Sequence, residues 1–230
     1  MASVKTWIYD LRDFLLPRRC AVCGCALSTS EQVLCSACLV ALPYLPMTDF
    51  RDNQENRLFW GKIPVERAHS YLSYRHGSPS HRLLMQLKYN HRPDLARWFG
   101  RQMAKDLKRR RFFEGVDCIV PVPLHWLRRL QRGYNQSLML AKGISEVSTL
   151  PVVENCVRRI RNNPTQTNRS ASERIVNVED VFSAMPNLPY HHVLLVDDVL
   201  TTGATLTSCA KAIQRQNPDV VFSILTLAKA

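Results

Sequence analysis

The chain has 230 residues, 46% of them hydrophobic, and a formal net charge of +12. This length suits one ordinary domain with a small accessory one, and the hydrophobic fraction excludes global disorder. A basic excess of this size indicates an anionic partner, such as nucleic acid, a polyphosphate metabolite or an acidic membrane surface. A basic chain can also simply be soluble.

The sequence predicts no membrane insertion, because no stretch of some 20 apolar residues occurs in it. Lys5, Asp10, Arg12 and Asp13 interrupt the apolar region that a secretory signal would need. We therefore expect a cytoplasmic protein, in which eight cysteines indicate metal ligation or free thiols rather than disulfides.

The first predicted element is a helix over residues 3–16, where apolar residues recur at helical spacing up to Pro17. Residues 18–40 contain a compact cysteine cluster. The proline-rich residues 41–66 are typical of an irregular connector.

From residue 67 onward, apolar strands alternate with helices. Strands are predicted over 68–74, 116–122, 192–198 and 220–227. Helices are predicted from Ser78-Pro79 and from Pro93, and over 133–148 and 203–216. This alternation predicts an α/β fold whose mainly parallel sheet has helices on both faces.

The cysteine cluster holds two C-x-x-C pairs, Cys20/Cys23 and Cys35/Cys38. Four thiolates complete the tetrahedron that zinc prefers in closed, structural sites, so we expect structural Zn²⁺ here. Cys25 is close enough to make the ligand set ambiguous. A redox dithiol is the alternative, but it lacks a βαβ setting. Cys118, Cys156 and Cys209 have apolar surroundings typical of core residues.

An acidic pair and a threonine loop follow the apolar strand residues Val193–Val196. A glycine and hydroxyls before a helix offer N–H and O–H donors to a phosphate, whereas adjacent carboxylates suit ribose hydroxyls or Mg²⁺. The segment therefore predicts a phosphorylated-ribose site made of Asp197, Asp198, Thr201, Thr202, Gly203, Ala204 and Thr205. The alternative is a turn at the acids, with Thr201 capping the helix.

One further basic segment is a candidate for the same site. Pro123 and Leu124 follow a predicted strand, and Arg128, Arg129 and Arg132 precede a predicted helix, where they would hold a diphosphate. A solvated basic face is the alternative.

The polar residues 158–179 are typical of a lid that excludes water, although composition alone favours an ordinary surface loop. Arg174 and Gln166 are its candidate functional residues.

The basic run Lys108–Arg111 is followed by Phe112 and Phe113, and it could contact single-stranded DNA through phosphates and stacking. A solvated helix end with both phenylalanines in the core is slightly favoured.

The acidic-threonine run resembles the site for 5-phosphoribosyl 1-pyrophosphate (PRPP) of type I phosphoribosyltransferases. With the paired C-x-x-C, Leu87-Lys88-Tyr89, Pro121–Leu124, Arg132–Gln136 and Gln166–Asn177, the whole chain resembles the ComF family, which is associated with natural competence and DNA uptake. This resemblance implies a zinc module over residues 1–45 and a type I phosphoribosyltransferase-like domain over 46–230.

The resemblance also implies that Asp197 and Asp198 contact the ribose hydroxyls and that residues 201–205 wrap the 5-phosphate. A loop after an early strand would bind pyrophosphate, for which 123–132 is the natural candidate. Lys88 either reaches the site or is simply solvated.

Two hypotheses of function follow. The first is a Mg²⁺-dependent phosphoribosyltransferase acting on an unidentified acceptor. The second is a non-enzymatic factor that binds single-stranded DNA or DNA-uptake proteins, with a regulatory or vestigial PRPP site. The oligomeric state stays open.

Overall fold

The structure is a computed structural model that describes residues 18–47, 49–160 and 181–230. The helix expected over 3–16 lies outside these residues, as do Gln166, Arg174 and most of the expected lid.

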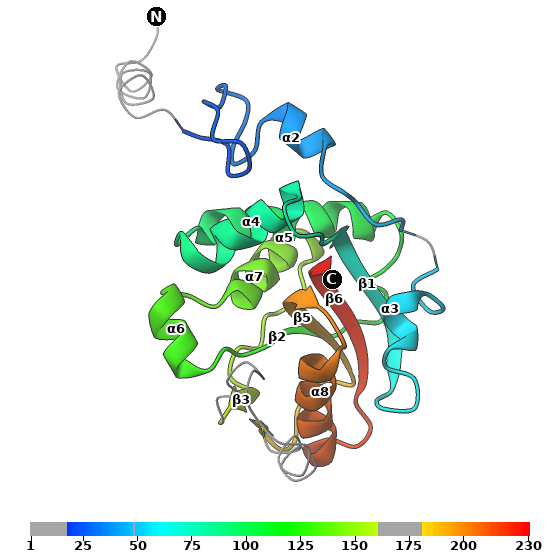
Figure 1. The fold of residues 1–230 in the computed structure, drawn as a ribbon. Coiled ribbons are helices and arrows are strands. Elements are labelled where there is room, and N and C mark those ends of the chain that lie inside the picture. The colour runs from blue at the N-terminus through cyan, green and yellow to red at the C-terminus, as the bar shows by residue number, and fades with distance from the viewer. Residues whose placement is uncertain (1–17, 48, 161–180) are drawn as a thin grey trace, which may run out of the picture.

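A four-stranded parallel sheet forms the centre of the molecule (Figure 1). Its order is β1 (Val65–Ser73), β6 (Val221–Lys229), β5 (His192–Leu200) and β2 (Cys118–Pro121). Val152 makes a single parallel bridge to Ile119 of β2. A separate antiparallel pair consists of β3 (Val157–Arg159) and β4 (Phe182–Ala184).

Helices cover both faces of the sheet, as the sequence predicts. Side chains alternate between the faces of a strand. Leu194 and Val196 of β5 accordingly join one buried cluster, with α4 (Pro79–Tyr89), α5 (Pro93–Lys108) and α7 (Gln136–Ser148). Val193 and Leu195 join a second cluster with α8 (Ala204–Gln216). The sheet is apolar on both sides, which explains the continuous apolar runs of its strands.

The predicted starts of two helices are confirmed. Ser78 caps α4 by accepting a hydrogen bond from the His81 N–H, and Pro79 is the first helical residue. Pro93 is likewise the first residue of α5, although Arg92 before it makes no side-chain cap. In both helices proline fixes the backbone at a position where its missing N–H has no helical partner.

Helices α5 and α7 approach closely through two glycines. A Cβ on Gly143 would lie 2.0 Å from the Arg97 carbonyl oxygen, and one on Gly100 would lie 2.2 Å from the Leu140 carbonyl oxygen. Both neighbours are backbone atoms, so only glycine permits this crossing.

The expected loop over 123–132 is wrong in part, because it contains a short helix, α6 (Trp126–Arg132). Gly133, with φ of 74°, ends α6, and Asn135 then caps α7, so α7 starts at Gln136 rather than at 133. Two turns of helix are too short to show a clear apolar period. Strand β5 also continues to Leu200, two residues beyond its predicted end.

The cysteine segment contains the short helix α2 (Ser36–Val40), and the connector contains α3 (Gln54–Arg57). Cys20, Ala21, Val22, Val33 and Leu34 are buried in the same cluster as α4 and α5. The cysteine segment therefore shares the core of the larger domain. Among the residues that the structure describes, no helix is both long and apolar enough to cross a membrane.

Candidate functional site

The acidic pair lies on the part of β5 that extends beyond the end of its neighbour β2. Pro121, the last residue of β2, pairs with Val196, so Asp197 and Asp198 extend past the end of that strand. The chain leaves β2 toward α7 on one face and leaves β5 toward α8 on the other. Such a divergence opens a crevice at the carboxyl edge of a parallel sheet, which is where ligands bind in open α/β folds.

Both carboxylates are held by specific contacts. Asp197 Oδ1 accepts hydrogen bonds from Ser137 Oγ and from the Asp198 N–H, each at 2.9 Å. Asp198 Oδ2 lies 3.5 Å from Lys88 Nζ and 4.0 Å from Arg132 Nη1. One acid is thus bonded within the protein, and the other faces two cations.

The pKa of Asp197 is raised to about 7, first by burial and then by repulsion from Asp198. The Ser137 hydroxyl, the Asp198 N–H and the charge of Lys88 oppose this shift. A bound cation would lower the pKa again by favouring the charged form. The pair therefore has the electrostatics of a site that receives positive charge or a hydrogen-bond donor.

Lys88 is positioned by the end of α4. Tyr134 Oη and Gln136 Nε2 both donate hydrogen bonds to the Leu87 carbonyl oxygen, at 2.6 and 3.2 Å. Arg132 Nη1 donates to Gln136 Oε1 at 3.0 Å. These contacts join Leu87-Lys88-Tyr89 to the α6–α7 junction. Of the two alternatives for Lys88, the structure favours a residue that reaches the site.

The threonine loop leads directly into α8. Thr201 and Thr202 are exposed, and Gly203 adopts a φ of 76° as the N-cap. The helix has no side-chain cap, and the Ala204 N–H makes only a long contact, 3.4 Å, with Thr202 Oγ1. Thr201 therefore does not cap this helix, in contrast to the alternative prediction. The N–H groups of the first helical turn, including that of Thr205, have no helical acceptor, an arrangement suited to an anion.

Phe59 of the connector fixes the approach of this loop. A Cβ on Gly203 would lie 2.9 Å from the Phe59 ring, which is fully buried. Glycine is thus required both by the backbone angle and by the packing.

The other predicted anion-binding residues have varied positions. Pro123 and Leu124 are half-buried between β2 and α6. Arg128 and Arg129 belong to α6 rather than to a loop, and Arg129 is exposed. Of the three arginines, Arg132 is the one with a recorded ion pair to the acids.

Arg159, the last residue of β3, is a further cation whose charge interacts with that of Asp197, and sequence reasoning did not single it out. Its guanidinium lies 5.5 Å from the centre of the Phe182 ring. Its pKa is lowered by burial and by the charge of Arg128, whereas the charge of Asp197 raises it. Arg159 therefore adds a cation near the acidic pair. In the sequence, the one feature that could have indicated Arg159 is its position at the start of the basic residues 158–179.

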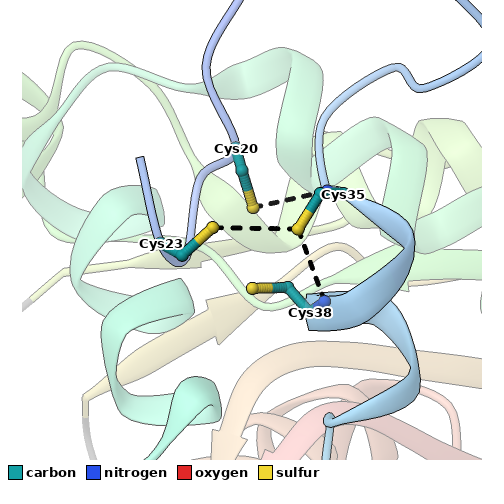
Figure 2. A group of neighbouring side chains, drawn as sticks. All are labelled: Cys20, Cys23, Cys35 and Cys38. Carbon is teal, nitrogen blue, oxygen red and sulfur yellow. Dashed lines mark hydrogen bonds between the residues drawn. The ribbon is translucent and has the colours of Figure 1, made fainter. Parts of the chain in front are cut away.

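The four predicted cysteine ligands converge on one point (Figure 2). Their sulfur atoms all lie within 4.8 Å of one another, and those of Cys23 and Cys35 are 3.7 Å apart. Sulfurs bound to zinc at ~2.3 Å in a tetrahedron would be about 3.8 Å apart. Cys20, Cys23, Cys35 and Cys38 thus fit a metal ion such as zinc.

Backbone N–H groups stabilise the negative charge of the cysteine thiolates. Burial alone would raise the pKa of Cys20, but N–H groups of Cys23, Cys35 and Val22 lower it. The pKa of Cys23 falls to about 6, chiefly through the backbone N–H of Cys25. Thiolates are the form that binds a metal.

Two neighbours of the cluster bear on its ligand set. Cys25 Sγ is 3.3 Å from Cys23 Sγ but is outside the group of four. Glu31 accepts hydrogen bonds from the N–H groups of Ser28 and Ser36 and so connects the two halves of the module. Cys118, Cys156 and Cys209 are buried core residues, as predicted.

Comparison with known proteins gives the family. Residues 135–230 match the model of the phosphoribosyl transferase domain. Competence protein F of Haemophilus influenzae is 34% identical over 143 residues, which cover 58% of this chain and 62% of that protein. The DNA utilization protein YhgH of Escherichia coli K12 is 30% identical over 209 residues, 88% of this chain and 86% of that protein. The chain belongs to the ComF family.

The match to the E. coli relative covers 88% of this chain, whereas the domain match begins at Asn135. Among solved structures, a glutamine PRPP amidotransferase from B. subtilis gives a TM-score of 0.37 at 16% identity, covering 61% of this chain and 39% of that one. In this ComF chain, Lys88 and Arg132 precede the matched domain but contact its acidic pair.

Proposed function

We propose that this protein binds PRPP with Mg²⁺ at the carboxyl ends of β5 and β2. The observation that carries the proposal is the acidic pair, which faces Lys88 and Arg132. The strand that holds the pair leads directly into a helix whose N-terminus has no side-chain cap. Asp197 and Asp198 would hold the ribose hydroxyls, and residues 201–205 would hold the 5-phosphate. The match to a phosphoribosyl transferase domain supports the same ligand.

The cations around the acidic pair would bind the diphosphate. Arg132 and Lys88 already face Asp198, and the charge of Arg159 interacts with that of Asp197. We assign Pro123, Leu124, Arg128, Arg129 and, outside the described residues, Arg174 to the same role. When bound, Mg²⁺ would neutralise phosphate charge. The acids would orient the sugar, so that C1 exchanges its bond to pyrophosphate for a bond to an acceptor.

Titration calorimetry with PRPP and MgCl₂ tests the binding step. The full-length protein should give saturable heat, and the double variant Asp197→Asn/Asp198→Asn should lose it. Lys88→Met should weaken binding at least tenfold, whereas Lys105→Met, an exposed lysine on α5, should have no effect. If the intact protein gives no heat, the proposal is wrong. Release of pyrophosphate that requires both acids would identify turnover.

A second candidate function is binding of single-stranded DNA, supported by the name of the E. coli relative and by the basic end of α5. Lys108–Arg111 are exposed, and Arg110 and Arg111 line a cavity of about 440 Å³ together with two further arginines, Arg51 and Arg67, and two acids, Asp49 and Glu114. Phe112 is fully buried against Phe50, as the slightly favoured alternative expects, and Phe113 is half-buried, so phosphate contacts rather than stacking on Phe112 would supply the affinity.

Fluorescence anisotropy with labelled oligothymidylate at several salt concentrations separates the two functions. Binding through phosphates should weaken steeply with salt, and Arg110→Ala/Arg111→Ala should reduce that slope. The aspartate double variant should keep this affinity. Loss of DNA binding in the aspartate variant, with no loss in the arginine variant, would contradict an independent DNA surface.

A further inference from the structure

The cysteine module contains five thiols, one more than a tetrahedral zinc site uses. The additional thiol belongs to Cys25, which lies outside the group of four. Its Sγ is nevertheless 3.3 Å from Cys23 Sγ, closer than the 3.7 Å between the sulfurs of Cys23 and Cys35, which are both members of the group. A thiol that the metal does not need is therefore in contact with one of the metal's ligands.

Cys23 is the ligand that a small molecule in the solvent can reach. Of the four cysteines drawn in Figure 2, Cys23 is the exposed one, whereas Cys20 is buried and neither Cys35 nor Cys38 is exposed. Cys25 is exposed as well. Because oxidation of a cysteine depends on access to its sulfur, an oxidant would react first at Cys23, with the Cys25 thiol beside it.

The backbone between the two cysteines leaves room for their sulfurs to join. Gly24 separates them with a φ of 77°, and a Cβ on this residue would have no atom within 4 Å. The turn is therefore not packed against the core. Sulfurs in a disulfide are about 2.05 Å apart, so those of Cys23 and Cys25 need to approach by little more than about 1 Å.

We propose that Cys23 and Cys25 form an oxidation site at which hydrogen peroxide converts the two thiols into a reversible disulfide. The Cys23 thiolate attacks one peroxide oxygen, so that an S–O bond forms, the O–O bond breaks and hydroxide leaves. The Cys25 thiol then attacks the sulfenic acid on Cys23. An S–S bond forms, the S–O bond breaks, and the departing hydroxyl leaves as water with the Cys25 proton. The two sulfurs lose two electrons, which the peroxide accepts.

This disulfide would remove one thiolate from the metal site. Zinc binds thiolates, so three remaining ligands should hold the ion less tightly and release it to a chelator. Metal binding and folding are linked in such modules, and Cys20 is buried in the same cluster as the residues of α4. Oxidation should therefore loosen the module as well as empty it. Neither PRPP nor DNA takes part, so this proposal does not depend on the proposed function.

Peroxide treatment of the full-length, zinc-loaded protein tests the proposal. After stoichiometric peroxide and alkylation of the free thiols, cleavage following Arg19 and Glu31 releases the peptide 20–31, which carries Cys20, Cys23 and Cys25. Mass spectrometry of its fragments should show an alkylated Cys20 and a disulfide between Cys23 and Cys25. A chromogenic chelator should detect zinc release in parallel, and dithiothreitol with added zinc should restore the bound metal.

The variant Cys25→Ser separates a reacting thiol from a bystander. Peroxide should still oxidise Cys23, but without its partner the sulfur should proceed to the sulfinic or sulfonic acid, which dithiothreitol does not reduce. The zinc regained after dithiothreitol should then fall about fivefold or more relative to the native protein. Ser30→Ala, which removes an exposed hydroxyl of the same module, should leave this recovery unchanged. The proposal is overturned if Cys25 is alkylated after peroxide treatment, if the disulfide joins Cys20 to Cys23, or if Cys25→Ser regains zinc as fully as the native protein.

Discussion

Replacing Asp197 with asparagine should stabilise the protein, and the gain should grow between pH 5 and pH 8. The pKa of Asp197 is raised from 3.8 to about 7 by burial and by Asp198. In that interval the folded protein binds a proton that the unfolded chain has lost, so the native protein loses stability as pH rises. Asparagine keeps the acceptor oxygen for Ser137 and Asp198 but does not ionise.

The magnitude follows from about 1.36 kcal/mol per pKa unit. Between pH 5 and the pKa near 7, the advantage of Asp197→Asn should grow by roughly 3 kcal/mol, and it should be constant at higher pH. Urea unfolding of both proteins near pH 5 and near pH 8 measures the change. An advantage that is equal at the two pH values, or a less stable variant at pH 8, would refute the electrostatic reasoning.

Asp117 provides a control of opposite sign. Its carboxylate accepts hydrogen bonds from the backbone N–H groups of His191 and His192, which lower its pKa. Stability from this group is present at neutral pH and is lost as pH falls through the lowered pKa. Asp117→Asn should therefore destabilise the protein at pH 8 rather than stabilise it.

Three further predictions concern packing and metal binding. Gly143→Ala should lower the free energy of unfolding by about 1–3 kcal/mol in chemical unfolding, since its Cβ would meet the Arg97 carbonyl. As a control, Lys142→Ala on the exposed face should change that free energy by less than about 0.5 kcal/mol. Tyr134→Phe should cost about 1 kcal/mol in the same assay by removing the bond to Leu87, and an unchanged stability would contradict that role. Zinc analysis should find one ion per chain in the native protein and in Cys25→Ser, but none in Cys38→Ser. Zinc retained in Cys38→Ser and lost in Cys25→Ser would make Cys25, and not Cys38, the fourth ligand.

Local patterns in the sequence were sufficient for the parts of the site that lie close together in the chain. The acids and the threonine loop follow one apolar strand, and the C-x-x-C pairs place their own thiols together. The strand alternation also predicted the sheet with helices on both faces, because burial on two sides leaves a continuous apolar run.

The remaining features depend on contacts between distant segments. Lys88 reaches Asp198 because Tyr134 and Gln136 bond the carbonyl of Leu87, and no periodicity in α4 reports that contact. Arg159 is held by the β3–β4 pairing and by the ring of Phe182 of β4, which lie far from the acids in the sequence. The close crossing at Gly100 and Gly143 likewise joins two helices that are separate in the sequence.

The shared core of the cysteine module and α4 has a thermodynamic consequence. Cys20 and Leu34 are buried in the same cluster as Leu83 and Leu87, and Lys88 follows Leu87 at the end of that helix. A metal ion that orders the module would therefore also bias the position of a cation that faces Asp198. If the metal raises the affinity for a ligand that contacts Lys88, linkage requires that this ligand raise the affinity for the metal by the same factor.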